Sequence, residues 1–169
     1  MNEIELIRAQ LAAERAHVKA VAQACARNAA ALAELDAAGA DYLRCVLGWF
    51  EARDQRLSEL IRTHPGLDAR ARHAIPAALA QPGSSREALE KLAAINAGTP
   101  VAWQALAQWV AGLWSSRRDA IDALLTAIRR PAEWRTIAAV DADSILDERR
   151  RFERVRAACP ADAPLAASC

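Results

Sequence analysis

The sequence predicts an all-α protein: an up-down four-helix bundle with an irregular crossover and additional short C-terminal helices. Three observations indicate this class. Hydrophobic residues make up 53% of the 169-residue chain, and the frequent Ala, Leu, Arg and Glu are good helix formers. β-branched residues are few and never alternate with polar ones, so no segment competes as a strand. Long stretches instead carry apolar residues at alternating steps of three and four.

The first two predicted helices form an antiparallel pair. The first covers residues 4–35, and Gly39 and the two alanines before it are expected to end it. The second begins near Asp41 as N-cap and runs to about Arg62, before a Pro-Gly pair. The stripe of the first helix is long and regular: Ile4, Ile7, Leu11, Glu14, Val18, Val21, Cys25, Asn28, Leu32 and Leu35.

The second half of the chain is less regular. Prolines limit residues 68–83 to an irregular crossover, and a capping box opens a short helix over 84–98. The next bundle helix covers 99–130, and a short helical turn carries Trp134, Ile137 and Val140. Asp143 is expected to cap a last helix, whose stripe is Ile145, Leu146, Arg149, Phe152 and Val155. We expect one domain over residues 1–158 and a flexible tail over 159–169.

Charged residues interrupt the apolar stripes near the middle of three long helices. Asp54 occupies the gap between Phe50 and Leu57, Glu14 interrupts the first helix, and Arg117 interrupts the helix over 99–130. Isolated buried charges cost several kcal/mol, which favours an ion pair between Arg117 and Asp54 or Glu14. Two alternatives are that each charge reaches water at the edge of the bundle, or that the charges form a binding site.

Four passages carry a family resemblance: "LIRAQLAAERAHVKAV", "LGWFEARDQRLSELI", "WVAGLWSSRRDAIDALL" and "PAEWRTIAAVDAD". Together, over residues 4–143, they resemble the hemerythrin-like (HHE) four-helix bundles, which bind two irons through inward-facing His and carboxylates. Of the ligand positions that the resemblance implies, Asp119 keeps its residue, and the others fall on Arg15 or the nearby His17, Glu51, Gln55 and Trp114. The resemblance therefore implies a relative that lost its metal, with a buried polar centre of Glu14, Asp54, Arg117 and Asp119.

The net charge of the chain and the motifs that it lacks exclude several classes of function. A net charge of +1 gives no reason to expect nucleic-acid binding. No Gly-rich phosphate loop, catalytic motif, metal-binding spacing or cofactor motif is present, and we expect no cofactor. No signal sequence or membrane-length apolar run is seen, which favours a cytoplasmic protein without a membrane partner. Cys25 and Cys45 fall on apolar stripes, where a small hydrophobic role is expected.

The sequence therefore predicts a non-enzymatic, soluble helical-bundle protein that acts through self-association or protein-partner binding. Trp49, Trp109 and Arg53 are the candidate interface, because Trp and Arg are frequent anchors of protein interfaces; a homodimer is one form such binding could take. The alternative is a hemerythrin-like metal or small-ligand sensor, using His17 with the carboxylates Glu14, Glu51, Asp54 and Asp119.

Overall fold

The chain is helical in the computed structural model, which describes residues 3–28, 33–69, 72–73, 85–93, 100–111, 124, 128–139, 141–160 and 165. The helices with defined bounds are α1 (Glu3–Asn28), α2 (Ala33–Thr63), α4 (Ser85–Ala93), α6 (Pro131–Ala138) and α7 (Ala142–Ala158). Residues 100–111 are helical as well. These ranges contain no strand, so the predicted all-α class is confirmed.

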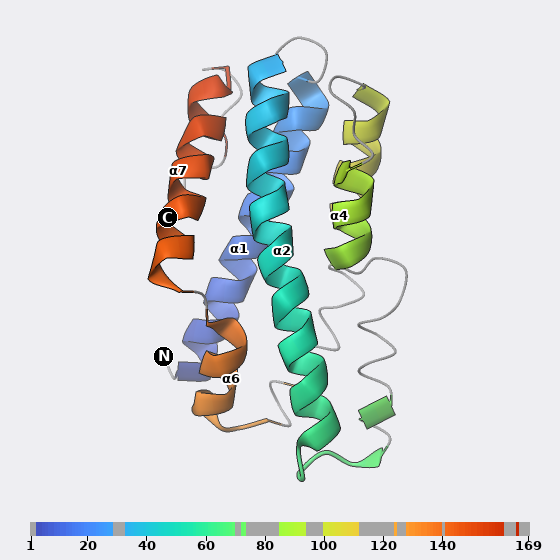
Figure 1. Ribbon diagram of the computed structural model, residues 1–169, viewed down its shortest axis with the longest axis vertical. Coiled ribbons are helices and arrows are strands. Elements are labelled where there is room, and N and C mark those ends of the chain that lie inside the picture. Colours follow the sequence, from blue (N-terminus) through green and yellow to red (C-terminus); the bar gives the residue numbers. More distant parts are fainter. Residues whose placement is uncertain are drawn as a thin grey trace.

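The long helix α2 is the centre of the arrangement. It contacts α1, α4, α6 and α7, and α6 also contacts α1. In Figure 1, α7 and α4 lie on opposite sides of α2, and α6 lies beside the N-terminal part of α1. None of the helices in the described part of the chain combines the length and the apolar character that a membrane crossing requires.

The core consists of two hydrophobic clusters stacked along α1 and α2. The upper cluster lies around the first half of α2, and α1, α4, residues 100–111 and α7 complete it; its buried members include Val18, Val21, Cys25, Leu43, Leu47, Phe50, Leu92, Trp103, Phe152 and Val155. The lower cluster lies around the second half of α2, and it includes Ile7, Leu11, Leu57, Ile61, Leu67, Leu124, Ile128, Trp134 and Ile137. Each long helix therefore contributes to both clusters.

The predicted connection between the first two helices was wrong in position. α1 ends at Asn28 and α2 already begins at Ala33, so the connection falls within residues 29–32, outside the described part. Gly39 and Asp41 lie inside α2 rather than at a break. The prediction failed because Leu35, which fits the periodicity of the first helix, is buried from the second helix instead.

The predicted cap of the last helix was wrong. The last helix is capped by Asp141 and not by Asp143: the Asp141 carboxylate accepts a 2.8 Å hydrogen bond from the backbone N–H of Ser144. In the predicted flexible tail, Cys159 and Leu165 pack against the upper cluster.

Gly39 lies at a tight contact between α2 and α1. A Cβ atom at Gly39 would collide with the sulfur of Cys25, and it would also contact Trp103 and Val21. Glycine weakens a helix interior, so a reason from packing is needed to explain it there. The absent side chain lets the two helix backbones approach around the Cys25 thiol.

Gly39→Ala should lower the free energy of unfolding by about 1–3 kcal/mol, because the new methyl group overpacks a filled contact. Cys25→Ala removes the colliding sulfur, so the Gly39→Ala/Cys25→Ala double variant should lose less than the sum of the two single changes. Urea denaturation of the three variants measures this coupling.

Gly48 supplies the matched control, because it lies in the same helix and a Cβ there would meet nothing within 4 Å. Gly48→Ala should leave stability unchanged or raise it by about 0.5–1 kcal/mol through helix propensity alone. Equal losses for Gly39→Ala and Gly48→Ala would contradict the close-approach explanation.

The buried Cys25 thiol should be inert in the folded protein. Burial, with a smaller contribution from the charge of Asp36, raises its pKa to about 12, so almost no reactive thiolate exists at neutral pH. We expect iodoacetamide at about pH 8 to modify the partly exposed Cys45 first and to reach Cys25 only after denaturation. Peptide mass spectrometry resolves the two sites, and comparable labelling rates in the native protein would contradict the prediction.

Candidate functional site

The charge that interrupts the buried face of α2 belongs to Arg53. Its side chain fills the step between Phe50 and Leu57 and is only 8% exposed, whereas the neighbouring Asp54 is half-buried. Both positions satisfy the alternation of three and four residues, so periodicity alone could not choose between them. Arg53 is the better occupant because its long apolar stem packs in the core.

Arg53 forms an ion pair with Glu14 of α1. Its Nη1 donates to Oε2 of Glu14 at 2.7 Å, and Gln10 donates to the other carboxylate oxygen at 3.1 Å. The guanidinium also lies 5.5 Å from the centre of the Phe50 ring. Nε and Nη2 of Arg53 are buried and find no hydrogen-bond partner among the residues that the structure describes.

The pair lies where the two hydrophobic clusters meet. On α1, the last lower-cluster residue is Leu11 and the first upper-cluster residue is Val18; on α2, the corresponding residues are Leu57 and Phe50. Glu14 and the arginine therefore occupy the single layer between the clusters. The structure thus pairs Glu14, which was predicted for the buried polar centre, with Arg53, which was predicted for the interface.

The other predicted site residues are only partly described by the structure. The backbone carbonyl of Asp54 accepts a 2.8 Å hydrogen bond from Ser58, and Arg117 and Asp119 lie outside the described residues. Trp109 is partly buried against the upper cluster. Among the described residues, no group of three or more His, Cys, Asp or Glu side chains is placed to hold a metal ion.

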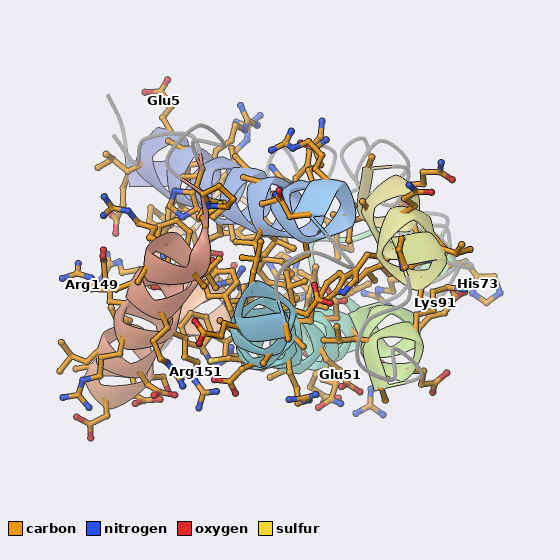
Figure 2. The ribbon with its side chains drawn as sticks, turned by 90° about the horizontal axis from the view of Figure 1, so that it is seen from above. Glu5, Glu51, His73, Lys91, Arg149 and Arg151 are labelled. Carbon is orange, nitrogen blue, oxygen red and sulfur yellow. The ribbon has the colours of Figure 1, made fainter. Side chains whose placement is uncertain are left out.

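Figure 2 places Glu51, one of the carboxylates of the predicted sensor site, at the edge of the bundle on α2. His17 and Glu14, by contrast, both line a cleft between α1, α2, α6 and α7.

This cleft has a volume of about 440 Å³. Its walls come from all four helices and the residue after α6, and they combine apolar, aromatic and charged side chains: Ile7, Gln10, Ala13, Glu14, His17, Tyr42, Val46, Trp49, Arg135, Ala138, Ala139, Ile145, Glu148 and Arg149. Trp49, predicted as an interface residue, is thus a half-buried wall of the cleft.

Two residues of the cleft lining, His17 and Tyr42, make aromatic contacts with Phe152 of α7. The His17 ring stacks on Phe152 with centroids 5.2 Å apart and an interplanar angle of 18°. Tyr42 contacts the same phenylalanine at 5.5 Å. These rings hold the inner face of α7 against both α1 and α2.

Glu148 is a wall residue of the cleft that the sequence reasoning did not single out. It is half-buried there, near Tyr42. Burial, followed by the charge of Glu148, raises the pKa of Tyr42. The signal was present, because Ile145, Glu148, Phe152 and Val155 are spaced by three and four, like the interrupted stripes of α1 and α2.

Most arginines of α7 are held by carboxylates. Asp41 of α2 binds both Arg151 and Arg154, the latter at 2.6 Å, and Arg156 pairs with Glu153 at 3.0 Å.

Two α7 arginines differ from these. Arg149 and Arg150 are exposed and form no ion pair within the described part of the chain, and Figure 2 shows Arg149 on the outer side of α7. Beside them, Ile145 and Leu146 are 40% and 50% exposed. We call these four residues, Ile145, Leu146, Arg149 and Arg150, the α7 patch.

Breaking the Glu14–Arg53 pair should have unequal effects on its two sides. Glu14→Leu strands the more deeply buried guanidinium and should cost about 3 kcal/mol, whereas Arg53→Met strands a carboxylate that keeps 20% exposure and should cost about 1–2 kcal/mol. The double variant should be close to neutral, because no unpaired charge remains. Urea denaturation of all three variants measures the coupling.

The exposed Glu59–Arg62 pair of α2 is the matched control, and removing either partner should cost less than about 1 kcal/mol. Additive losses in the Glu14→Leu/Arg53→Met double variant would show that the two charges are not coupled.

Comparison with known proteins returned no match, since no family model, no curated protein and no solved structure matches this chain. The hemerythrin-like resemblance therefore stays a prediction from the sequence. Any function has to be inferred from the residues themselves.

Proposed function

We propose that this chain is a non-enzymatic binding protein, built as an up-down four-helix bundle, that recognises an acidic segment of a protein partner through α7. The observation that carries the proposal is the α7 patch, in which two exposed aliphatic side chains adjoin two arginines without ion-pair partners among the described residues. The ion pair of Glu14 and Arg53 takes the place of a metal centre in this proposal and has a structural role.

The arginines give the patch its charge preference. The described structure pairs Arg151, Arg154 and Arg156 with carboxylates, so the two arginines of the patch are the α7 guanidiniums available to a partner. A guanidinium binds carboxylates through paired, directed hydrogen bonds. The patch should therefore prefer a surface rich in Asp and Glu.

The aliphatic side chains give the patch its shape preference. Ile145 and Leu146 lie one helical turn before Arg149 and Arg150, so the four side chains form one continuous strip along α7. An amphipathic helix can place leucines against the aliphatic part and carboxylates against the basic part. We therefore expect the partner to present an acidic amphipathic helix.

Binding can be tested with a synthetic amphipathic peptide of about 16 residues that carries Leu on one face and Glu on the other. Fluorescence anisotropy should show binding that weakens as salt is raised, because exposed charges are screened. The Arg149→Glu/Arg150→Glu variant should bind at least about tenfold more weakly, since two attractive contacts become repulsive.

Two controls make the test specific. Arg156→Glu changes an α7 arginine outside the patch and should leave peptide affinity nearly unchanged, and a peptide with Lys in place of Glu should not bind. Equal affinity for both peptides, or no effect of the double charge reversal, would contradict the proposal. Sedimentation can also show whether the chain forms a homodimer. A homodimer that still forms in the Arg149→Glu/Arg150→Glu variant would mean that the binding interface lies outside the α7 patch, which would likewise contradict the proposal.

A further inference from the structure

We infer that the cleft between α1, α2, α6 and α7 is a binding site for a small organic cation with an apolar body. The inference rests on the cleft's volume, its aromatic walls and the distribution of its charges. It does not depend on the proposed partner of the α7 patch, although Ile145 and Arg149 belong to both surfaces.

The size and walls of the cleft suit a small organic molecule. A volume of about 440 Å³ lies within the usual range for ligand sites. Ile7, Val46 and Ala138 supply apolar surface from three different helices, and Trp49 and Tyr42 add large rings from α2. Such walls favour burial of an apolar body.

Glu148 is the acidic group inside the cleft that lacks a cationic partner. The other wall carboxylate, Glu14, is already paired with Arg53 at 2.7 Å. Glu148 lies near Tyr42, and it forms no ion pair among the residues that the structure describes. A half-buried carboxylate can accept hydrogen bonds from a bound ammonium group.

The arginines of the lining lie at the rim and leave the interior acidic. Arg135 is exposed and paired with Glu3 of α1. Arg149 is exposed on the outer side of α7 (Figure 2). Charges at the rim are screened by water, whereas the half-buried carboxylate acts at closer range.

The aromatic walls add a second preference for a cation. The aromatic residues Trp49, Tyr42 and His17 all line the cleft, and the His17 ring stacks on Phe152. The face of an aromatic ring attracts a cation, most strongly for Trp, and an apolar body can stack on the same faces. A carboxylate and aromatic rings around one cavity therefore select an amine over a carboxylic acid of the same size.

Two probes of nearly equal size test this preference: 2-phenylethylamine, which is cationic at neutral pH, and 3-phenylpropionate, which is anionic. Isothermal titration of the full chain should detect the amine with a Kd of about 1 mM or tighter. The acid should bind at least about tenfold more weakly, because Glu148 repels it.

Glu148→Gln should reduce amine affinity about tenfold or more, since it removes the carboxylate charge and keeps the size of the side chain and a carbonyl acceptor. Glu153→Gln is the control on α7, because that carboxylate pairs with Arg156 outside the cleft, and it should leave amine affinity unchanged.

Equal binding of the two probes, absence of amine binding at 10 mM, or unchanged affinity in Glu148→Gln would each overturn the inference. The comparison of probes on the unmodified chain decides the question even if a variant fails to fold. Because the amine titration is done without peptide and uses a probe that needs Glu148, it can fail while the acidic peptide still binds, and the reverse result is equally readable.

Discussion

The ion pair between Glu14 and Arg53 joins α1 to α2 at the one layer where the two hydrophobic clusters meet. An apolar layer would merge the clusters, but it would allow the helices to slide by a turn with little penalty. A buried guanidinium needs its carboxylate, so only one register of α1 against α2 satisfies both charges. The positions of the cleft and of α7 depend on that register.

The cleft shows how the pair and α7 are linked. Glu14 contributes to the pair and to the cleft wall, so neutralising it inside the core leaves the chemistry of the cleft to Glu148. The position of Glu148 in turn depends on how α7 is held. Asp41 binds Arg151 and Arg154 on one side of α7, and Phe152 packs against His17 and Tyr42 on another. These contacts fix the helix so that Glu148 faces inward.

The sequence predicted the helical class, the buried stripes of α1 and α2 and the position of Glu14, because all of these follow from a period that one helix imposes on its own residues. It did not predict whether Arg53 or Asp54 fills the gap, since both fit that period. It also took Gly39 for a break, because the reason for that glycine is the sulfur of Cys25 on another helix. Contacts between helices decide such cases, and no single helix carries that information.

The close contact at Gly39 can act as a pivot between α1 and α2, so that a small rotation there displaces the far ends of the two helices. In Figure 1, α1 and α2 cross at an angle, and α6, which contacts both helices, lies beside the N-terminal part of α1. From Cys25 to Ile7 the distance along α1 is about 27 Å, so each degree of rotation about the contact displaces the far end by roughly 0.5 Å. A hydrogen atom in place of a methyl group at Gly39 thus affects how closely α1 and α2 are spaced at the lower cluster, several turns away.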